Sequence, residues 1–239
     1  MLFILIQVSR LVILHEEAER NGGVIADLSL HVDGVQSAVE NLMKVGYETV
    51  QSSEDQILRQ DMPAMLRRVQ EACDQLVDAA AILKDEPTSS EGRQLLITGS
   101  RGILRATSLL LITFDDFEVR KLVKQCKAML DYLGIVEVID AMNDLVEFVK
   151  NLSPILTKMT RDVSQRADDL TSQDRKQTIS KNLDVIRSQM PNLVNAVKSY
   201  ITTRNRNAAV QDATENRDAI CKSMTTAIKE VCAIIVLLF

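Results

Sequence analysis

Apolar residues recur along this chain at alternating spacings of three and four, which is the period of one buried face on an α-helix. Three stripes hold this spacing without a slip, at residues 62–83, 142–163 and 179–200. A looser stripe covers residues 32–45, and a last one covers residues 220–238. The pattern predicts long amphipathic helices, each with one apolar face.

The breaks between the stripes carry local start and stop signals. Asp61 followed by Pro63 predicts a helix start, because proline is tolerated in a first turn where its missing N–H has no partner to lose. Pro87 predicts a helix end, and Ser90 with Glu91 belongs to a capping pattern that opens the next helix. The predicted helices span residues 2–19, 28–59, 61–84, 89–133, 135–169, 173–203 and 208–238.

The predicted fourth helix is too long for one compact bundle of this size. At 1.5 Å per residue, about 45 residues extend ~68 Å. Short connections make sequential helices antiparallel neighbours. We therefore predict an all-α fold of seven helices, which form two four-helix bundles that share a long central helix. The N-terminal bundle is expected at about 1–112 and the C-terminal bundle at about 113–239, with helix 89–133 common to both.

Composition narrows the classes of function. Aromatic residues make up only 3% of the chain, with 8 glycines and 4 prolines, so a turn-rich β-sheet fold is disfavoured. The net charge is −5 with both signs interspersed, and this argues against nucleic acid as a partner. The four cysteines are far apart inside apolar stripes, which is typical of reduced core thiols. The closing apolar run of nine residues, 231–239, is too short to span a bilayer, so we expect no membrane insertion.

Catalytic patterns are not found in the sequence. His15 precedes Glu16 and Glu17 but lacks the second histidine of a zinc-protease helix, and we expect surface or helix-end roles for His15 and His31. The stretch from Gly99 to Gly102 has no following Lys-Ser or Lys-Thr in the spacing of a phosphate-binding loop, so close helix packing is the better interpretation. We expect a binding module rather than an enzyme, with no metal and no cofactor.

Several stretches resemble the vinculin/α-catenin family, and they are closer to its vinculin branch than to α-catenin. These stretches are VGYETVQSSEDQILRQDMP at 45–63, GSRGIL at 99–104, LLITFDDFEVRK at 110–121 and LTKM at 156–159. The resemblance extends from Leu11 to the C-terminus. It implies a first head domain of a cytoskeletal linker that works in the cytoplasm at cell-matrix and cell-cell junctions.

The resemblance also implies a partner and a site. In the family, an amphipathic talin helix enters between the first and second helices and converts a four-helix bundle into a five-helix one. Helix-in-groove recognition uses apolar anchors of the kind found here. Carried over by motif, the partner-helix site comprises Ile4, Val8, Leu11, Val32, Val35, Ala38, Val39, Leu42, Val45, Ile103, Leu104 and Phe114.

Other partners and two alternatives stay open at this point. Helices of α-actinin or of a catenin are further partners that the resemblance implies, as is the tail of the full-length protein. One alternative is an α-catenin-like linker between cadherin and catenin, which would engage a catenin helix through the same bundle. The other is a structural homodimer in which apolar ends pack against a second copy.

Overall fold

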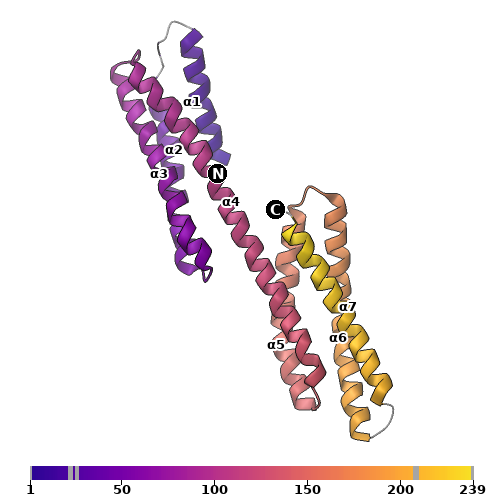
Figure 1. The fold of residues 1–239 in the computed structure, drawn as a ribbon. Helices are drawn as coiled ribbons and strands as arrows, with labels where there is room; N and C mark the ends of the chain where they lie inside the picture. Colours follow the sequence, from indigo (N-terminus) through magenta and orange to yellow (C-terminus); the bar gives the residue numbers. More distant parts are fainter. Residues whose placement is uncertain (1, 21–23, 25–26, 207–209, 238–239) are drawn as a thin grey trace. The chain divides into compact units, whose positions relative to one another are not determined.

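The chain forms two compact helical units, Met1–Phe117 (unit 1) and Glu118–Phe239 (unit 2). The computed structural model describes every residue except 1, 21–23, 25–26, 207–209 and 238–239. Its described part contains seven α-helices and one short 3₁₀ helix, η1, as Figure 1 shows. The predicted all-α fold with seven helices is therefore confirmed.

Unit 1 consists of α1 (Leu2–Arg20), α2 (Ser29–Ser52), α3 (Gln56–Asp85) and the first part of α4 (Ser90–Gly134). Each helix turns one apolar face toward a common core, because its apolar residues return to the same side every three or four positions. The fully buried positions include Val8, Leu11, Val35, Val39, Leu66, Val69, Leu76, Ile103 and Leu110.

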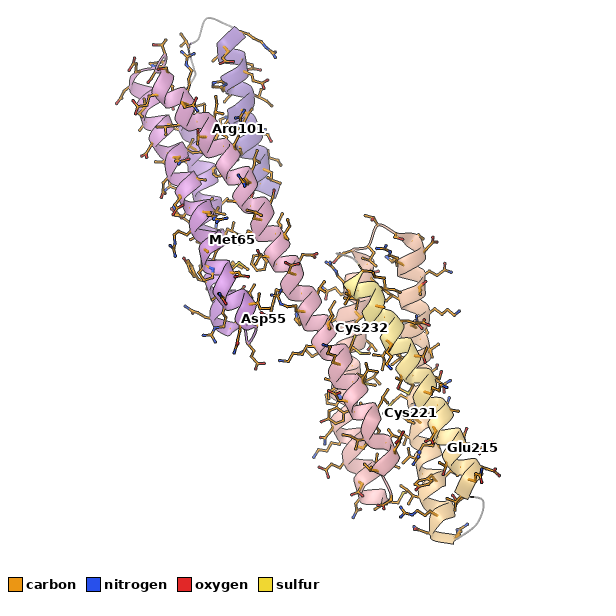
Figure 2. The ribbon with its side chains drawn as sticks, viewed as in Figure 1. Asp55, Met65, Arg101, Glu215, Cys221 and Cys232 are labelled. Atoms are coloured by element: carbon orange, nitrogen blue, oxygen red, sulfur yellow. The ribbon has the colours of Figure 1, made fainter. Side chains whose placement is uncertain are left out.

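The boundary between α2 and α3 differs from the prediction, which placed it at residues 59–61. The structure ends α2 at Ser52 and begins α3 at Gln56. Asp55 has an extended backbone, and its side chain accepts a hydrogen bond from the Leu58 amide at 2.8 Å (Figure 2). This N-cap satisfies one of the free amides at the helix start, so α3 starts there and Pro63 lies inside the helix.

Unit 2 consists of the last part of α4, then η1 (Ile135–Val138), α5 (Met142–Asp168), α6 (Gln173–Arg206) and α7 (Val210–Val236). The prediction had the fifth helix begin at residue 135, and this was wrong. Residues 135–139 are rich in β-branched side chains, which lose rotamer freedom in a helix. Val136 and Ile139 are buried in the core here, and the backbone is extended at Ile139 and Ala141 before α5 begins. The predicted ends of the last helix at 208 and 238 lie outside the described residues.

The long helix α4 is continuous over 45 residues and supplies core residues to both units. Leu96, Ile103 and Leu110 are buried in the core of unit 1. Leu122 and Met129 are buried in the core of unit 2. The shared central helix is therefore present, as its length indicated.

The helical stretch that contains α4 is long and apolar enough to cross a membrane. Among the described residues, one helical stretch, Ser90–Val138, contains an 18-residue window with a mean hydropathy of 1.4. Residues of this stretch face both helical cores. Of that window 39% is buried inside the protein, and one such helix is weak evidence for a membrane span.

Candidate partner-helix groove

The inner face of α1 closes one side of unit 1. Ile4, Val8 and Leu11 are all buried, at spacings of four and three. His15 continues the same face and is only 7% exposed, with its Nε2 atom 3.8 Å from Glu19 Oε1. The expectation of a surface or helix-end role was therefore wrong for His15, because a ring on the inner stripe fills core volume.

The outer face of α1 is also apolar. Ile6, Val12 and Ile13 are exposed there, although a helix at the surface of a bundle usually turns polar side chains to water. Large exposed apolar areas mark interaction surfaces more often than chance. Helix α1 therefore has apolar side chains both toward the core and away from it.

The register between α1 and α2 fixes how much of α2 is covered. His31 Nδ1 lies 2.9 Å from Gln7 Oε1. A Cβ atom on Gly34 would lie 3.6 Å from the ring of Phe3 and 3.7 Å from Gln7 Cγ. The first two turns of α1 thus lie against the first two turns of α2. The two helices run antiparallel, so the residues of α2 after Gly34 continue for about 27 Å past the first described turn of α1.

The apolar stripe on α2, which is the apolar seam of this helix, becomes more exposed toward its C-terminal end. Val32, Val35 and Val39 are buried, whereas Ala38 and Leu42 are half-buried and only pack against the edge of the core. Val45, which the sequence pattern placed on the seam, is 55% exposed. Its expected position on the buried face was wrong, because the glycine at 46 takes the inward position in that turn.

Gly46 is a feature that the apolar pattern did not reveal. It is buried, and a Cβ atom there would lie 2.7 Å from Leu66 Cδ2. Leu66 of α3 therefore rests on the bare backbone of α2. A glycine interrupting an apolar stripe was the available signal, since such a residue often marks a close approach.

Helix α4 forms the other side of this region. Ile103 is buried, and Leu104 and Phe114 are half-buried against the same core. Leu111 and Ile112 are exposed on α4 close to Phe114 in sequence. Three further residues that sequence reasoning missed also pack against the edge of this core: Met43, Val50 and Phe117.

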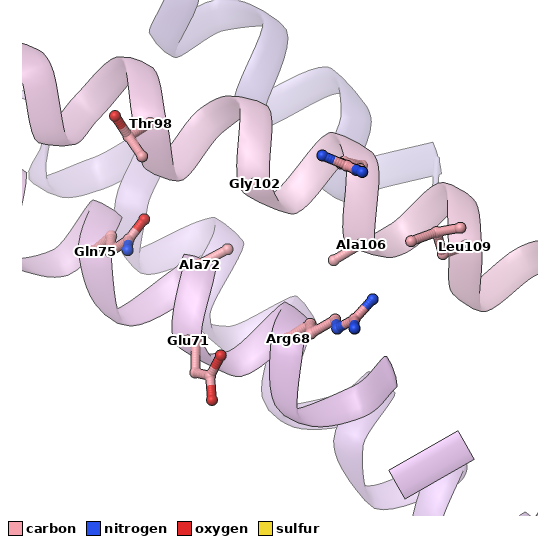
Figure 3. A pocket seen from close by; sticks show the side chains of 9 residues that line it. Arg68, Glu71, Ala72, Gln75, Thr98, Gly102, Ala106 and Leu109 are labelled. Atoms are coloured by element: carbon pink, nitrogen blue, oxygen red, sulfur yellow. The ribbon is translucent and has the colours of Figure 1, made fainter. Parts of the chain in front are cut away.

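A pocket lies on unit 1 between α3 and α4 (Figure 3). Its volume is about 420 Å³, and its lining includes Arg68, Glu71, Gly102 and Arg105. The two helices approach closely here, since a Cβ atom on Gly102 would lie 2.9 Å from Ala72 Cβ. The glycines of the 99–102 stretch thus serve helix packing, as the sequence indicated. The lining mixes charged and polar side chains with Ala72, Ala106 and Leu109.

The described residues offer little reactive chemistry. Burial raises the pKa of the Cys73 thiol to about 11 and that of Cys126 to about 12, so neither is a thiolate at neutral pH. All four cysteines are free, and Cys221 and Cys232 are half-buried. Within the described part of the chain, no group of three His, Cys, Asp or Glu side chains is placed to hold a metal ion. The most developed site is therefore the apolar seam beside α2.

Comparison with known proteins gives consistent results. A model of the vinculin family matches residues 2–237. Vinculin from Homo sapiens is 44% identical over 226 residues, which are 94% of this chain and 20% of that protein. Vinculin from Drosophila melanogaster is 45% identical over 226 residues, again 94% of this chain and 23% of that protein. The chain thus spans about a fifth of the length of these relatives.

Solved structures point the same way. A vinculin homologue from a sponge has a TM-score of 0.77 and 35% identity, and the match covers 97% of this chain and 29% of that one. A chain in the HMP-1–HMP-2 complex has a TM-score of 0.67 at 17% identity, with 97% of this chain and 94% of that chain covered. At that identity the second likeness shows a shared fold alone.

Proposed function

The chain belongs to the vinculin family, and on that premise we propose that it is the head segment of a cytoskeletal adhesion adaptor. Unit 1 captures an amphipathic talin-type helix between α1 and α2. In the full-length protein this capture links adhesion receptors to actin, in the cytoplasm at cell-matrix and cell-cell junctions. The chain itself carries out no catalysis and needs no cofactor.

The observation that supports this proposal best is the apolar seam of α2. Val35 and Val39 on this seam are buried, whereas Ala38 and Leu42 are half-buried at the edge of the core. An incoming helix with apolar residues at positions i, i+3, i+4 and i+7 can lie along this seam. Each large apolar side chain that becomes fully buried contributes roughly 1.5–3 kcal/mol.

Capture also requires α1 to move, because its inner face occupies the start of the same seam. The partner then replaces contacts that Val8 and Leu11 make in the free unit, so the core loses little apolar burial during the exchange. The outer face of α1 is apolar, and α1 can pack through this face after it moves. A four-helix arrangement becomes a five-helix one in which Ile103, Leu104 and Phe114 of α4 lie beneath the new helix.

The test is titration of this chain with a synthetic talin-type helix, followed by calorimetry and size-exclusion chromatography. We expect a one-to-one complex. Leu42→Ser should weaken it, because Leu42 lies on the half-buried seam, whereas Val77→Ser on α3 should not, because Val77 is exposed and does not belong to this core. Equal affinity in both variants would remove the seam from the site, and a dimer of the chain alone would favour a homodimeric role.

Other helices are candidates for the same groove. Helices of α-actinin or of a catenin, and the tail of the full-length protein, would compete with the talin-type helix if they use the same anchors. Competition in the titration above identifies them, because two helices that share Leu42 cannot bind together.

A further inference from the structure

Unit 2 has an apolar surface of its own where α4 passes through η1 into α5. Val138 is 73% exposed and Val146 is 67% exposed, and Ile135 and Met142 are exposed as well. The core beneath is already closed by buried residues such as Val136 and Leu145. The exposed side chains are therefore not needed to complete the core, and covering them would remove apolar surface from water.

A pocket lies within this surface. Its volume is about 440 Å³, which falls in the range of roughly 300–1,000 Å³ that is typical of ligand pockets. Tyr132 of α4 and Phe148 of α5 line it together with Ile139, and the last two are buried. Aromatic and branched side chains on three segments thus form an apolar floor large enough for a side chain from outside.

The rim of the pocket is acidic. Asp144 and Glu147 belong to its lining, both are exposed, and neither makes an ion pair with another described residue. The lining contains no lysine or arginine. Asp140, close by in sequence, is already paired with Arg204 at 2.8 Å.

The start of α5 offsets this negative charge only in part. A helix N-terminus carries about half a positive charge, and Asp144 lies in the first turn of α5. Two carboxylates bring two formal negative charges, so a net negative potential remains. A cationic group that binds next to an apolar floor is the complement of such a site.

We propose that this pocket binds a short basic amphipathic segment of another protein. One large apolar side chain of the segment enters between Val138 and Phe148, and a lysine or arginine one turn away pairs with Asp144 and Glu147. The proposal concerns unit 2 alone and does not depend on helix capture by unit 1.

The probe is a fluorescein-labelled 12-residue peptide with leucines on one helical face and lysines on the other, titrated into the full chain and followed by anisotropy. A second peptide has glutamate in place of every lysine. We expect the lysine peptide to bind more tightly, and added salt to reduce the difference. Asp144→Asn combined with Glu147→Gln should weaken its binding about threefold to tenfold, since an exposed ion pair contributes modestly.

Three variants complete the test. Val138→Ser should also weaken binding, because it removes an apolar wall while leaving the charges in place. Asp169→Asn combined with Asp184→Asn changes the net charge equally at exposed positions outside the pocket lining, so it should leave binding unchanged. Ala38→Ile tests whether the peptide binds unit 1 instead.

Each contrary result overturns the proposal. Equal affinity for both peptides would exclude charge recognition. Binding that falls in Ala38→Ile but not in the Asp144 and Glu147 variant would belong to unit 1. If the chain alone dimerises in sedimentation equilibrium and Val138→Ser abolishes the dimer, the occupant is a second copy and not a basic segment.

Discussion

The helices of unit 1 approach one another over glycine and alanine, whereas unit 2 fills its core with larger side chains. A Cβ atom at Gly46, Gly99 or Gly102 would come within 3.0 Å of a neighbouring helix. After residue 117 the sequence has one glycine, Gly134, and a Cβ atom there would meet nothing within 4 Å. The core of unit 2 instead contains Phe148 and four buried methionines, Met129, Met159, Met190 and Met224.

The units also differ in how far neighbouring helices lie against each other. In unit 2, α6 and α7 run beside each other (Figure 1) and bury residues along their lengths. In unit 1, α1 lies against the first turns of α2, and Ala38 and Leu42 further along α2 are only half-buried. We therefore assign the proposed helix exchange to unit 1.

The largest predicted effect concerns the contact between Gly46 and Leu66. Leu66→Ala should destabilise the protein by about 2–5 kcal/mol, because it leaves a cavity over a residue without a side chain. Gly46→Ala alone should destabilise it by roughly 1 kcal/mol, since the added methyl group crowds Leu66 more than helix propensity compensates.

In the Leu66→Ala background the same Gly46→Ala change should become stabilising, because the methyl group then fills part of the cavity. Urea unfolding of the four proteins measures the coupling. Additive effects would show that α2 and α3 do not meet over Gly46.

The next effect concerns affinity for the partner helix. Ala38→Ile should weaken binding by about 1–3 kcal/mol, because added methylenes obstruct close approach at the half-buried seam. The variant should still fold, since Ala38 lies at the edge of the core. Ala64→Ile on the exposed face of α3 is the matched control. An unchanged affinity in Ala38→Ile would remove this residue from the groove.

Two glycines should respond with opposite signs to the same substitution. Gly99→Ala would bring a Cβ atom within 3.1 Å of the Ala72 carbonyl oxygen, so we expect lower stability by about 1 kcal/mol after allowing for helix propensity. Gly134→Ala should raise stability by about 0.4–1 kcal/mol, because its backbone is helical and the space is open. The same sign for both changes in thermal unfolding would contradict the packing difference between the units.

The smallest effect is on pH dependence in unit 2. Burial raises the pKa of Asp162, but hydrogen bonds from Gln125 (2.8 Å) and Arg161 outweigh this, so the pKa lies below its ordinary value of 3.8. A lowered pKa stabilises the folded state above pH 3.8 and loses this contribution as the pH falls through the folded-state pKa. Gln125→Ala should therefore reduce the loss of stability between pH 5 and pH 2, measured by unfolding at each pH. An unchanged slope would show that this hydrogen bond does not hold the charge.

The sequence predicted the helices better than their ends, for a physical reason. Apolar spacing reports burial, so it located all seven helices, but it is silent about backbone geometry at a junction. The cap at Asp55 and the β-branched stretch of η1 depend on local hydrogen bonds and on which side chains turn inward. Pro63 was assigned to a first turn because proline usually lies there.

The candidate groove was predictable only in part. The stripes identified Val35 and Val39 correctly as inward positions. They did not show that Val45 faces water, because Gly46 breaks the stripe and takes the inward place. The predicted 28–59 helix is shorter in the structure, where α2 ends at Ser52.

Native-state hydrogen exchange of the free chain and of its complex with a talin-type helix tests the central claim most directly. Local opening requires less free energy where fewer buried contacts are lost. We predict that residues 8–18 of α1 exchange faster than residues 142–160 of α5 in the free chain. Adding the partner helix should change protection in α1 and increase it along α2, while α5 stays the same. Equal protection of the two segments, before and after the helix is added, would contradict capture by unit 1.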